Sequence, residues 1–391
     1  MAEPPRVYLD HAATTPVHPK VLEAMLPYFS ETYGNPSSVH RWGQQAEAAV
    51  ERARRGMAEI LGCSPGEIIF TACGSESDNL ALRGAALARR KQYGHNHLVI
   101  SAVEHHAVLK TAESLAQIEG FQVDLVQPDR FGEIHVEDLA RLLRPDTAVV
   151  SIMYANNEVG TVNQISDMAR LCRDRGLPFH TDAVQAGGHL SLDVETLGVD
   201  MLSLGAHKFY GPKGVGALYV RAGTELLPTL TGGSQEFGLR AGTHNVPLIV
   251  GMAEALRLVQ QEGKERAART LPLRDRLIQG VPGAVPQTQV TGHPTNRLPN
   301  HASFVFEGVD GNQLLAALDL AGFACSSGSA CKTGDPEPSQ VLLAMGLSPE
   351  WALGSLRVTL GRSTGSDDIE RFLSLLPGLI QRFRAQAAVH S

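Results

Sequence analysis

Short apolar runs alternate, along the first half of the chain, with stretches in which apolar side chains recur at helical spacing. Residues 43–61 belong to the second kind, because small and aliphatic side chains occupy one side and arginine and glutamate the other. The pattern predicts strands at 67–71, 97–101, 121–126, 147–153, 176–179, 199–204 and 216–220, and helices at 43–61, 76–90, 107–118, 135–143 and 164–175. A repeated strand–helix order is typical of a mostly parallel sheet with helices on both faces, so we expect an α/β fold.

The pattern changes after residue 230, where a glycine-rich loop leads into more helical sequence. A helix is predicted at 246–261, and a charged stretch at 264–266 is taken to begin a second helix that ends near Gly280. The remaining predicted elements are strands at 302–306 and 355–359 and helices at 311–321 and 367–383. We therefore expect a large domain at residues 16–262, and a smaller α+β domain formed by residues 1–15 and 263–391.

Composition narrows the class of protein. The 391 residues are 43% hydrophobic and 19% charged, with a formal charge of -7, which describes an ordinary globular chain. No basic stripe favours nucleic acid, and no apolar run is long enough to span a membrane. The N-terminus lacks the pattern of a secretion signal, and the five cysteines are an odd number, typical of free thiols in a reducing compartment. We expect a cytoplasmic protein, and no cysteine–histidine spacing predicts a metal site.

Two polar residues follow apolar runs at positions where a parallel sheet places its ligands. Lys208 comes after the run 199–204, and Asp182 comes after 176–179. Burial lowers the pKa of a lysine and makes it a usable nucleophile or base, although an exposed lysine in a polar turn is equally compatible with the sequence. Together the two residues suit pyridoxal phosphate, which needs a lysine for its covalent link and a carboxylate beside its ring nitrogen.

A run of small residues, Ala72 to Ser77, lies where the strand at 67–71 gives way to a helix. Such a junction leaves backbone N–H groups free to hold a phosphate at the positive end of the helix. An ordinary capped helix start would give the same pattern. Beside Lys208 and Asp182, we assign Gly74 and Ser75 to the phosphate of the cofactor.

These residues belong to a wider likeness. From Tyr8–Pro16 through to Leu356–Arg362, nearly the whole chain resembles the cysteine desulfurases, which are class V aminotransferases among the fold-type I pyridoxal-phosphate enzymes. The resemblance implies a large domain with a mostly parallel sheet of the seven-stranded type, flanked by helices, and a smaller α+β C-terminal domain. It also implies removal of sulfur from L-cysteine, giving L-alanine.

The resemblance assigns roles residue by residue. Lys208 matches the lysine that carries the cofactor and moves protons, Asp182 the partner of the ring nitrogen, and His105 the imidazole that stacks on the ring. Further cofactor-binding matches are Gln185, Asn156, His207 and Thr243. Thr243 is expected to reach the phosphate of the neighbouring subunit, which implies a homodimer. Arg357 matches the arginine that pairs with the substrate carboxylate, a role that its planar fork of donors suits, and Asn35 is expected to help.

Two positions depart from the family. Phe237 stands where an arginine is common after Gln235-Glu236, and the other departure lies just before the lysine. A serine that donates to the phosphate usually stands three residues before the lysine, and here that residue is Gly205. Ser203 lies on the same strand face by the period of two. Phosphate binding is therefore expected to depend more on Gly74, Ser75, His207 and Thr243.

The sulfur chemistry is assigned to Cys331 in the loop Ser326-Ser327-Gly328-Ser329-Ala330-Cys331. A cysteine among small residues in a loop is expected to be exposed, as a reactive thiol must be. The pattern resembles that of the desulfurases with a long catalytic loop, and it selects Cys331 over Cys325. The implied product is a persulfide on Cys331 that passes to an acceptor protein, for iron–sulfur cluster assembly or for thiolation of tRNA or a cofactor.

Three other functions remain open from the sequence. A class V aminotransferase would use Lys208 and Asp182 without needing Cys331. A selenocysteine lyase would use the same residues on a selenium substrate. A sulfur-relay scaffold without catalysis is a remote alternative, because it would not need Lys208, Asp182 and Arg357, and all three are present.

Overall fold

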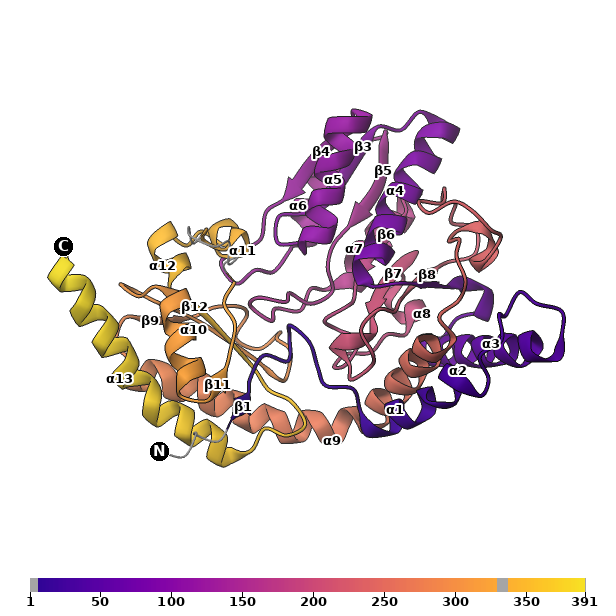
Figure 1. Ribbon diagram of the computed structural model, residues 1–391. Helices are drawn as coiled ribbons and strands as arrows, with labels where there is room; N and C mark the ends of the chain where they lie inside the picture. The colour runs from indigo at the N-terminus through magenta and orange to yellow at the C-terminus, as the bar shows by residue number, and fades with distance from the viewer. Residues whose placement is uncertain (1–5, 329–336, 391) are drawn as a thin grey trace.

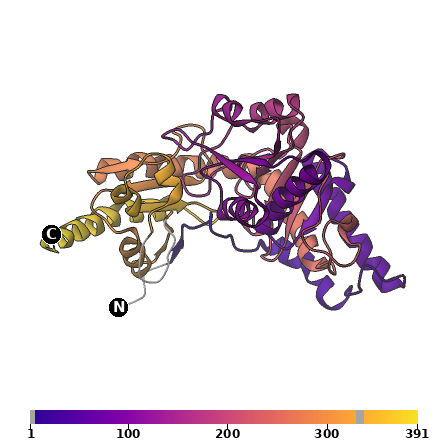
Figure 2. The same cartoon turned by 90° about the horizontal axis from the view of Figure 1, so that it is seen from above.

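The computed structural model describes residues 6–328 and 337–390 and divides them into two lobes (Figure 1). The larger lobe contains a seven-stranded sheet and the smaller lobe a three-stranded sheet. The helix α9 (Val246–Ala284) runs along one side of both lobes and connects them. The C-terminal helix, in yellow, and the short N-terminal strand, in indigo, both belong to the smaller lobe (Figure 2).

The large sheet is mostly parallel, as predicted. Its strands, in spatial order, are β2 (Ile68–Thr71), β8 (Gly216–Val220), β7 (Met201–Gly205), β6 (Phe179–Asp182), β5 (Thr147–Ser151), β3 (His97–Ser101) and β4 (Gln122–Val126). Only β8 runs against its neighbours, β2 and β7. The parallel strands therefore end at the same edge of the sheet, which is where open α/β sheets bind ligands.

Both faces of this sheet are covered by helices. Along β8, Leu218 packs with the helices α4 (Gly74–Tyr93) and α5 (His106–Glu119), whereas Tyr219 packs with the opposite core. Because helices cover both faces of the inner strands, these strands read as continuous apolar runs, whereas the edge strand β4 is partly exposed. The other helices of this lobe are α1 (Pro19–Met25), α2 (Pro27–Ser30), α3 (Arg41–Leu61), α6 (Val136–Leu142), α7 (Ile165–Asp174) and α8 (Val194–Leu197).

The prediction of two helices between residues 246 and 280 is wrong, because α9 is a single continuous helix. The charged residues at 264–266 are good helix formers, so they continue the helix and do not begin a new one. Met252 and Leu256 pack in the core of the large lobe, and Leu277 and Val281 pack in the core of the small lobe. The domain boundary proposed at residues 262 and 263 therefore falls inside a helix that serves both cores.

The small lobe joins the beginning of the chain to its end. Strand β10 (His301–Phe306) lies between β9 (Thr288–Val290) and β12 (Ser355–Thr359), antiparallel to both. Strand β1 (Val7–Tyr8) pairs in parallel with β11 (Phe323–Ala324). The helices are α10 (Gly311–Leu320), α11 (Gln340–Ala344), α12 (Pro349–Leu353) and α13 (Ser366–His390). In the part of the chain that the structure describes, no helix has the length and apolarity to cross a membrane.

Candidate active site

A cavity of about 120 Å³ lies where β2, β3, β5, β6 and β7 end. Residues that line it come from these five strand ends and from the loops and helix start that follow them. Its lining brings together the predicted residues Lys208, Asp182, His105, Gln185, His207, Gly74 and Ser75. Distant parts of the sequence therefore meet at one site because parallel strands share a carboxyl edge.

Lys208 enters this cavity from a single 3₁₀ turn, Ala206–Lys208, that follows β7. Its amine donates hydrogen bonds to the carbonyl oxygens of Ala12 and Ala13, at 2.7 and 2.8 Å. Burial and the positive charge of Arg357 lower the pKa of Lys208 to about 8, although nearby carboxylates act in the opposite direction. An amine with this pKa is partly uncharged near neutral pH and is able to attack an aldehyde.

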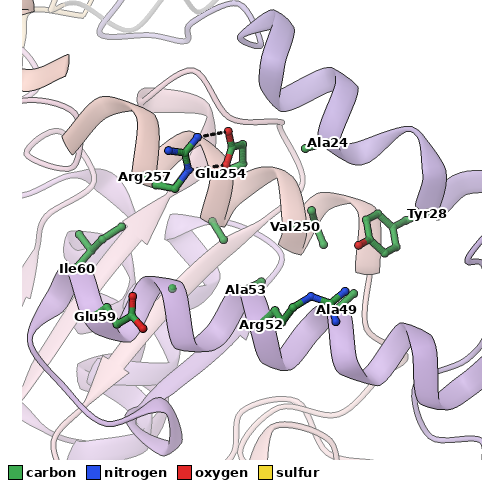
Figure 3. A pocket seen from close by; sticks show the side chains of 12 residues that line it. Ala24, Tyr28, Ala49, Arg52, Ala53, Glu59, Ile60, Val250, Glu254 and Arg257 are labelled. Atoms are coloured by element: carbon green, nitrogen blue, oxygen red, sulfur yellow. Dashed lines mark hydrogen bonds and ion pairs between the residues drawn. The ribbon is translucent and has the colours of Figure 1, made fainter. Parts of the chain in front are cut away.

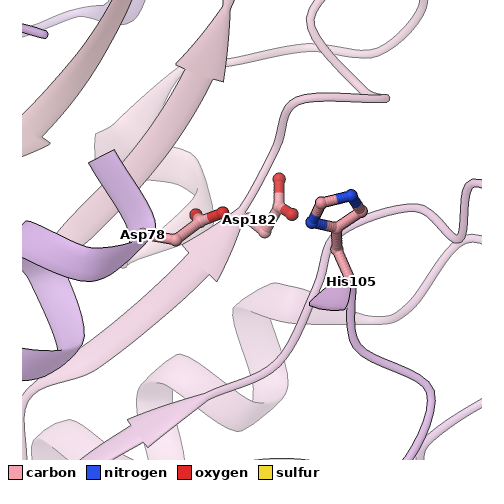
Figure 4. A group of neighbouring side chains, drawn as sticks. All are labelled: Asp78, His105 and Asp182. Carbon is pink, nitrogen blue, oxygen red and sulfur yellow. The ribbon is translucent and has the colours of Figure 1, made fainter. Parts of the chain in front are cut away.

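Asp182 and His105 face each other across the cavity, and Asp78 completes the group (Figure 4). Polar atoms of the three side chains lie within 4.8 Å of one another. Asp182 closes β6, and its carboxylate accepts the N–H of Val184 at 2.9 Å. Burial raises the pKa of Asp182, while His105 and Lys208 favour its charged form. This buried carboxylate is placed to pair with a protonated ring nitrogen, which would supply the positive charge that it lacks.

The helix α5 fixes His105. As the residue before the helix, His105 accepts the N–H of Ala107 on its Nδ1 at 3.0 Å, so the ring orientation is set by the backbone. Burial lowers the pKa of His105, which keeps the imidazole neutral. A neutral, oriented ring at the cavity wall suits stacking on an aromatic ligand.

Asp78 is a site residue that the sequence analysis did not single out. It lies on α4 and is 1% exposed, and its Oδ1 has no hydrogen-bond partner among the described residues. Burial and the charge of Asp182 raise the pKa of Asp78 well above its ordinary range. The available signal was its position in the first turn of the predicted helix 76–90, shortly after Ser75. The spacing of Asp78, His105 and Asp182 would also suit a metal ion.

The start of α4 forms an anion cradle at one end of the cavity. The first-turn N–H groups, at Gly74 and Ser75, have no acceptor within the helix, and Cys73 before them provides no side-chain cap. Close packing requires glycine here, since a Cβ at Gly74 would lie 2.7 Å from Val184. His207 lines the same cavity, and its Nδ1 lies 3.2 Å from the hydroxyl of Thr14. Burial lowers the pKa of His207 to about 4, so this imidazole is neutral.

The departure at Gly205 leaves space at this cradle. A Cβ at Gly205 would lie 3.5 Å from the backbone nitrogen of Gly74, which is ordinary van der Waals contact. Ser203 does not compensate, because its hydroxyl is buried against His180 Nε2 at 2.9 Å. An anion bound at this cradle would therefore contact backbone groups and His207.

Of the two adjacent asparagines, the structure brings Asn157 to the cavity and keeps Asn156 away from it. The side chain of Asn156 is fully occupied: its amide donates to the carbonyl of Val103 at 2.9 Å, and its oxygen accepts the N–H groups of Glu158 and Val159. Asn156 thus builds the turn that presents Asn157. Gln185 lies at the cavity as expected, and its Nε2 donates to the carbonyl of Ala12 at 2.8 Å.

Arg357 stands on β12 of the small lobe and reaches toward the cavity. Its guanidinium donates to the carbonyl of Asn157 at 2.9 Å and to Asp10 at 3.0 Å. The Nε of Arg357 is buried with no hydrogen-bond partner in the described chain. A ligand carboxylate between Arg357 and Lys208 would satisfy this donor.

Asn35 and Thr243 do not line the cavity that contains Lys208. Both are exposed and lie in a separate hollow of about 380 Å³, together with Tyr28 and Tyr33. The oxygen of Asn35 accepts the N–H of Ser37 at 3.0 Å, which shapes its loop. Within one chain, neither residue meets Lys208.

Cys331 lies outside the described residues, so the structure gives its position no description. The described cysteines are all free thiols. Burial raises the pKa of Cys63 and of Cys172 to about 12, and it raises the pKa of Cys325 further. These three thiols are therefore poor nucleophiles near neutral pH.

A second cavity, of about 290 Å³, lies between α1, α3 and α9 (Figure 3). Its walls combine small apolar residues, including Ala49, Ala53 and Val250, with charged side chains such as Arg52 and Glu59. At its rim Glu254 and Arg257 pair with each other at 2.6 Å. Among the described residues that line this second cavity there is no lysine, histidine or cysteine, so the cavity at Lys208 is the candidate active site.

Known proteins resemble this chain over almost its whole length. The family profile described as Aminotransferase class-V matches residues 7–372. Cysteine desulfurase IscS of Methanosarcina thermophila is 45% identical over 378 residues, covering 97% of this chain and 93% of that protein. Cysteine desulfurase IscS of Dictyoglomus turgidum is also 45% identical, covering 97% and 95%. A solved structure of a NifS-like protein has a TM-score of 0.90 at 37% identity, covering 96% of this chain and 100% of the other. A NifS-like protein from Rickettsia africae has a TM-score of 0.86 at 28% identity, covering 96% and 99%.

Proposed function

This chain belongs to the class V aminotransferase family, and from that premise we propose that it is a pyridoxal-phosphate-dependent cysteine desulfurase. The relatives described as cysteine desulfurases cover it almost end to end. The observation that carries the proposal is the cavity in which an amine of lowered pKa, Lys208, meets a buried carboxylate, Asp182. An inactive scaffold would have no need for either group to be desolvated.

The cavity suits the cofactor at both ends. Gly74 and Ser75 would hold the phosphate with their backbone N–H groups, and His207 would lie beside it. Asp182 would pair with the ring nitrogen, and His105 would cover one face of the ring. Asn157 and Gln185 are placed at the wall between these ends, and in this proposal Asn157 takes the role that the sequence assigned to Asn156.

Pyridoxal phosphate, when bound, supplies an electron-withdrawing ring that stabilises negative charge at the substrate Cα. The amine of Lys208 would hold the cofactor covalently and, once released by the substrate amine, would take and return the Cα proton. Arg357 would bind the substrate carboxylate through the fork that now pairs with Asp10 and the carbonyl of Asn157. Asp182 would remain ionised opposite the positive ring nitrogen.

The sulfur step is assigned to Cys331. Its thiolate would attack the sulfur of the substrate, so that a sulfur–sulfur bond forms and the bond between Cβ and sulfur breaks. The carbon keeps the electron pair and takes a proton, which gives L-alanine and leaves a persulfide on Cys331. Cys325 is a poor alternative, because burial raises the pKa of its thiol.

A homodimer with shared sites forms part of the proposal. Thr243 and Asn35 lie in the exposed hollow away from Lys208, and the exposed ring of Tyr33 lines the same hollow. Tyr33 is 66% exposed, Trp42 55% and Phe237 62%, which is costly on an isolated surface. A second copy covering this surface would bring Thr243, and with it Asn35, toward the cavity of its partner.

The destination of the sulfur is proposed only as a class. The acceptor is a protein of iron–sulfur cluster assembly or of tRNA or cofactor thiolation, and the free thiols support a reducing, cytoplasmic location. Selenocysteine would fit the same groups and is expected as an alternative substrate.

The proposal is tested with the purified protein, L-cysteine and dithiothreitol, by an absorption spectrum and by measuring alanine and sulfide. We expect a yellow protein that releases both in equal amounts. Cys331→Ser should keep the spectrum and lose the release, while the matched control Cys325→Ser keeps both. A yellow protein that instead transfers amino groups to a keto acid would make it an aminotransferase. A protein that stays colourless with added pyridoxal phosphate would contradict the assignment of Lys208.

A further inference from the structure

Glu158 has no role in the chemistry described so far, yet it lies at a junction of three segments. It follows Asn157, a wall residue of the active-site cavity. The oxygen of Asn156 accepts the backbone N–H of Glu158 at 2.8 Å, so the turn that presents Asn157 also fixes Glu158. The backbone of this turn is held a second time, because the carbonyl of Asn157 accepts from Arg357 at 2.9 Å.

The carboxylate of Glu158 contacts both stems, which we define as residues 326–328 and 337–339. On the second stem, the hydroxyl of Ser339 donates a hydrogen bond to Glu158 Oε2. Ser339 is 2% exposed and also caps α11, where it accepts the N–H of Leu342 at 3.1 Å. On the first stem, a Cβ at Gly328 would overlap Glu158 Oε2 and would lie 3.1 Å from the Ser339 hydroxyl. A side chain at residue 328 would therefore displace the Glu158 carboxylate, because the two stems and Glu158 meet at one point.

The first stem is also attached to the strand that carries Arg357. Ser326 and Arg357 form an antiparallel bridge with backbone hydrogen bonds of 2.7 and 3.3 Å. The N–H of Gly328 donates to the hydroxyl of Ser355 at 3.2 Å. The first stem is therefore tied to the substrate-carboxylate side of the site, and Glu158 ties the second stem to the first.

In sequence, the two stems flank the residues that include Cys331. We infer that Glu158 is a positioning residue that fixes the two stems against the active-site wall, so that sulfur transfer to Cys331, but not cofactor binding, depends on it. This inference rests on the proposed desulfurase function and adds a residue to it.

The electrostatics of the junction give the inference a pH signature. Burial raises the pKa of Glu158 to about 7, although the Ser339 hydroxyl and the charge of Arg357 favour its ionised form. Arg357 on β12 is the charged side chain that faces Glu158 in the described chain, and it is itself paired with Asp10. His301 on β10 contacts the neighbouring Asn157 carbonyl at 3.2 Å, and burial lowers its pKa well below the ordinary range, so it stays neutral. An ionised carboxylate accepts the Ser339 hydrogen bond more strongly, so positioning should improve as the pH rises through about 7.

The test compares Glu158→Ala, Glu158→Gln and Ser339→Ala in the holoenzyme. One readout is the single-turnover rate of alanine formation from L-cysteine. The other is the shift of the cofactor absorption on adding L-alanine, which needs Lys208 and Arg357 but no thiol. Asp310→Ala is the matched control for Ser339→Ala, because Asp310 caps α10 in the same lobe and contacts neither stem.

We expect Glu158→Ala to slow alanine formation by about tenfold or more, since small displacements of a reacting group are costly, and to leave the L-alanine shift unchanged. Ser339→Ala should show the same slower alanine formation with an unchanged L-alanine shift, whereas Asp310→Ala should form alanine at the wild-type rate. Glu158→Gln keeps an acceptor for Ser339, so it should retain most of the rate but lose the pH dependence near 7.

Two results would overturn this inference without affecting the proposed function. In the first, Glu158→Ala and Ser339→Ala form alanine at the wild-type rate. In the second, the variants lose the rate of alanine formation and the L-alanine shift to the same extent. If Glu158→Ala does not fold, Ser339→Ala and Glu158→Gln still decide between these outcomes. Absence of alanine formation by the wild-type protein would instead remove the proposed function, and the inference with it.

Discussion

The cavity around Lys208 and the hollow around Thr243 differ in how completely one chain builds them. In the cavity, the carboxylate of Asp182 is buried, the amine of Lys208 is half-buried and the imidazole of His105 is exposed at the wall, and backbone groups of the same chain hold all three. In the hollow, Asn35 and Thr243 are exposed, and Tyr33 beside them is 66% exposed. One chain therefore holds the groups around Lys208 in place by itself, while the hollow resembles a surface that a second chain would cover. Three predictions test that difference.

The largest effect is expected at the closed cavity. Lys208→Ala removes the buried amine and should lower alanine formation by about a thousandfold or more, because no other group there can act as the nucleophile. The absorption of the covalently held cofactor should disappear as well. Lys213→Ala, five residues later and exposed, is the matched control and should keep both properties. Equal losses in the two variants would mean that neither alanine formation nor cofactor attachment depends specifically on the amine of Lys208.

An intermediate effect is expected at the open hollow. Trp42 is exposed and lies beside the hollow, because its backbone packs against Gly34 in the wall. Trp42→Glu should raise the dimer dissociation constant by about a hundredfold, as loss of an aromatic anchor typically does. Light scattering after size exclusion measures the mass. Ile118→Glu is the control, because Ile118 is 75% exposed on α5, away from the hollow. A wild-type protein that is monomeric, or a Trp42→Glu dimer of unchanged affinity, would contradict a shared site.

The smallest effect is expected at Gly205, where the family usually has a serine that donates to the phosphate. Gly205 has an extended backbone with φ of -134°, and the space beside Gly74 N accepts a Cβ. Gly205→Ser should therefore tighten binding of pyridoxal phosphate by about threefold, the gain of one modest hydrogen bond. Gly205→Ala fills the same space without a hydroxyl and should bind as the wild type does. Titration of the apoprotein measures both, and weaker binding by the serine variant would show that the cradle has no such space.

The sequence predicted the closed cavity better than the rest. Lys208 and Asp182 were recognisable because each follows an apolar run, and the end of a buried strand is where such groups acquire lowered or raised pKa values. The order of strands and helices in the large lobe was equally readable, because both faces of the sheet are buried and the apolar runs are unambiguous.

Other features depended on three-dimensional packing that the pattern does not encode. Asn156 and Asn157 are identical neighbours, and only the turn decides which one faces the cavity. Asp78 reads as an ordinary helix residue until its packing beside Asp182 is known. The continuity of α9 was missed because charged residues at 264–266 resemble a helix start as much as a helix interior.

The central claim is that sulfur leaves L-cysteine for Cys331 at a site built around Lys208. The most direct measurement is a single turnover without reductant, in which alanine is counted and peptides are analysed by mass. We predict one sulfur atom added to the peptide that contains Cys331 for each alanine formed. Alanine formed with no added sulfur there, or with the sulfur on Cys325 or another cysteine, would contradict the account.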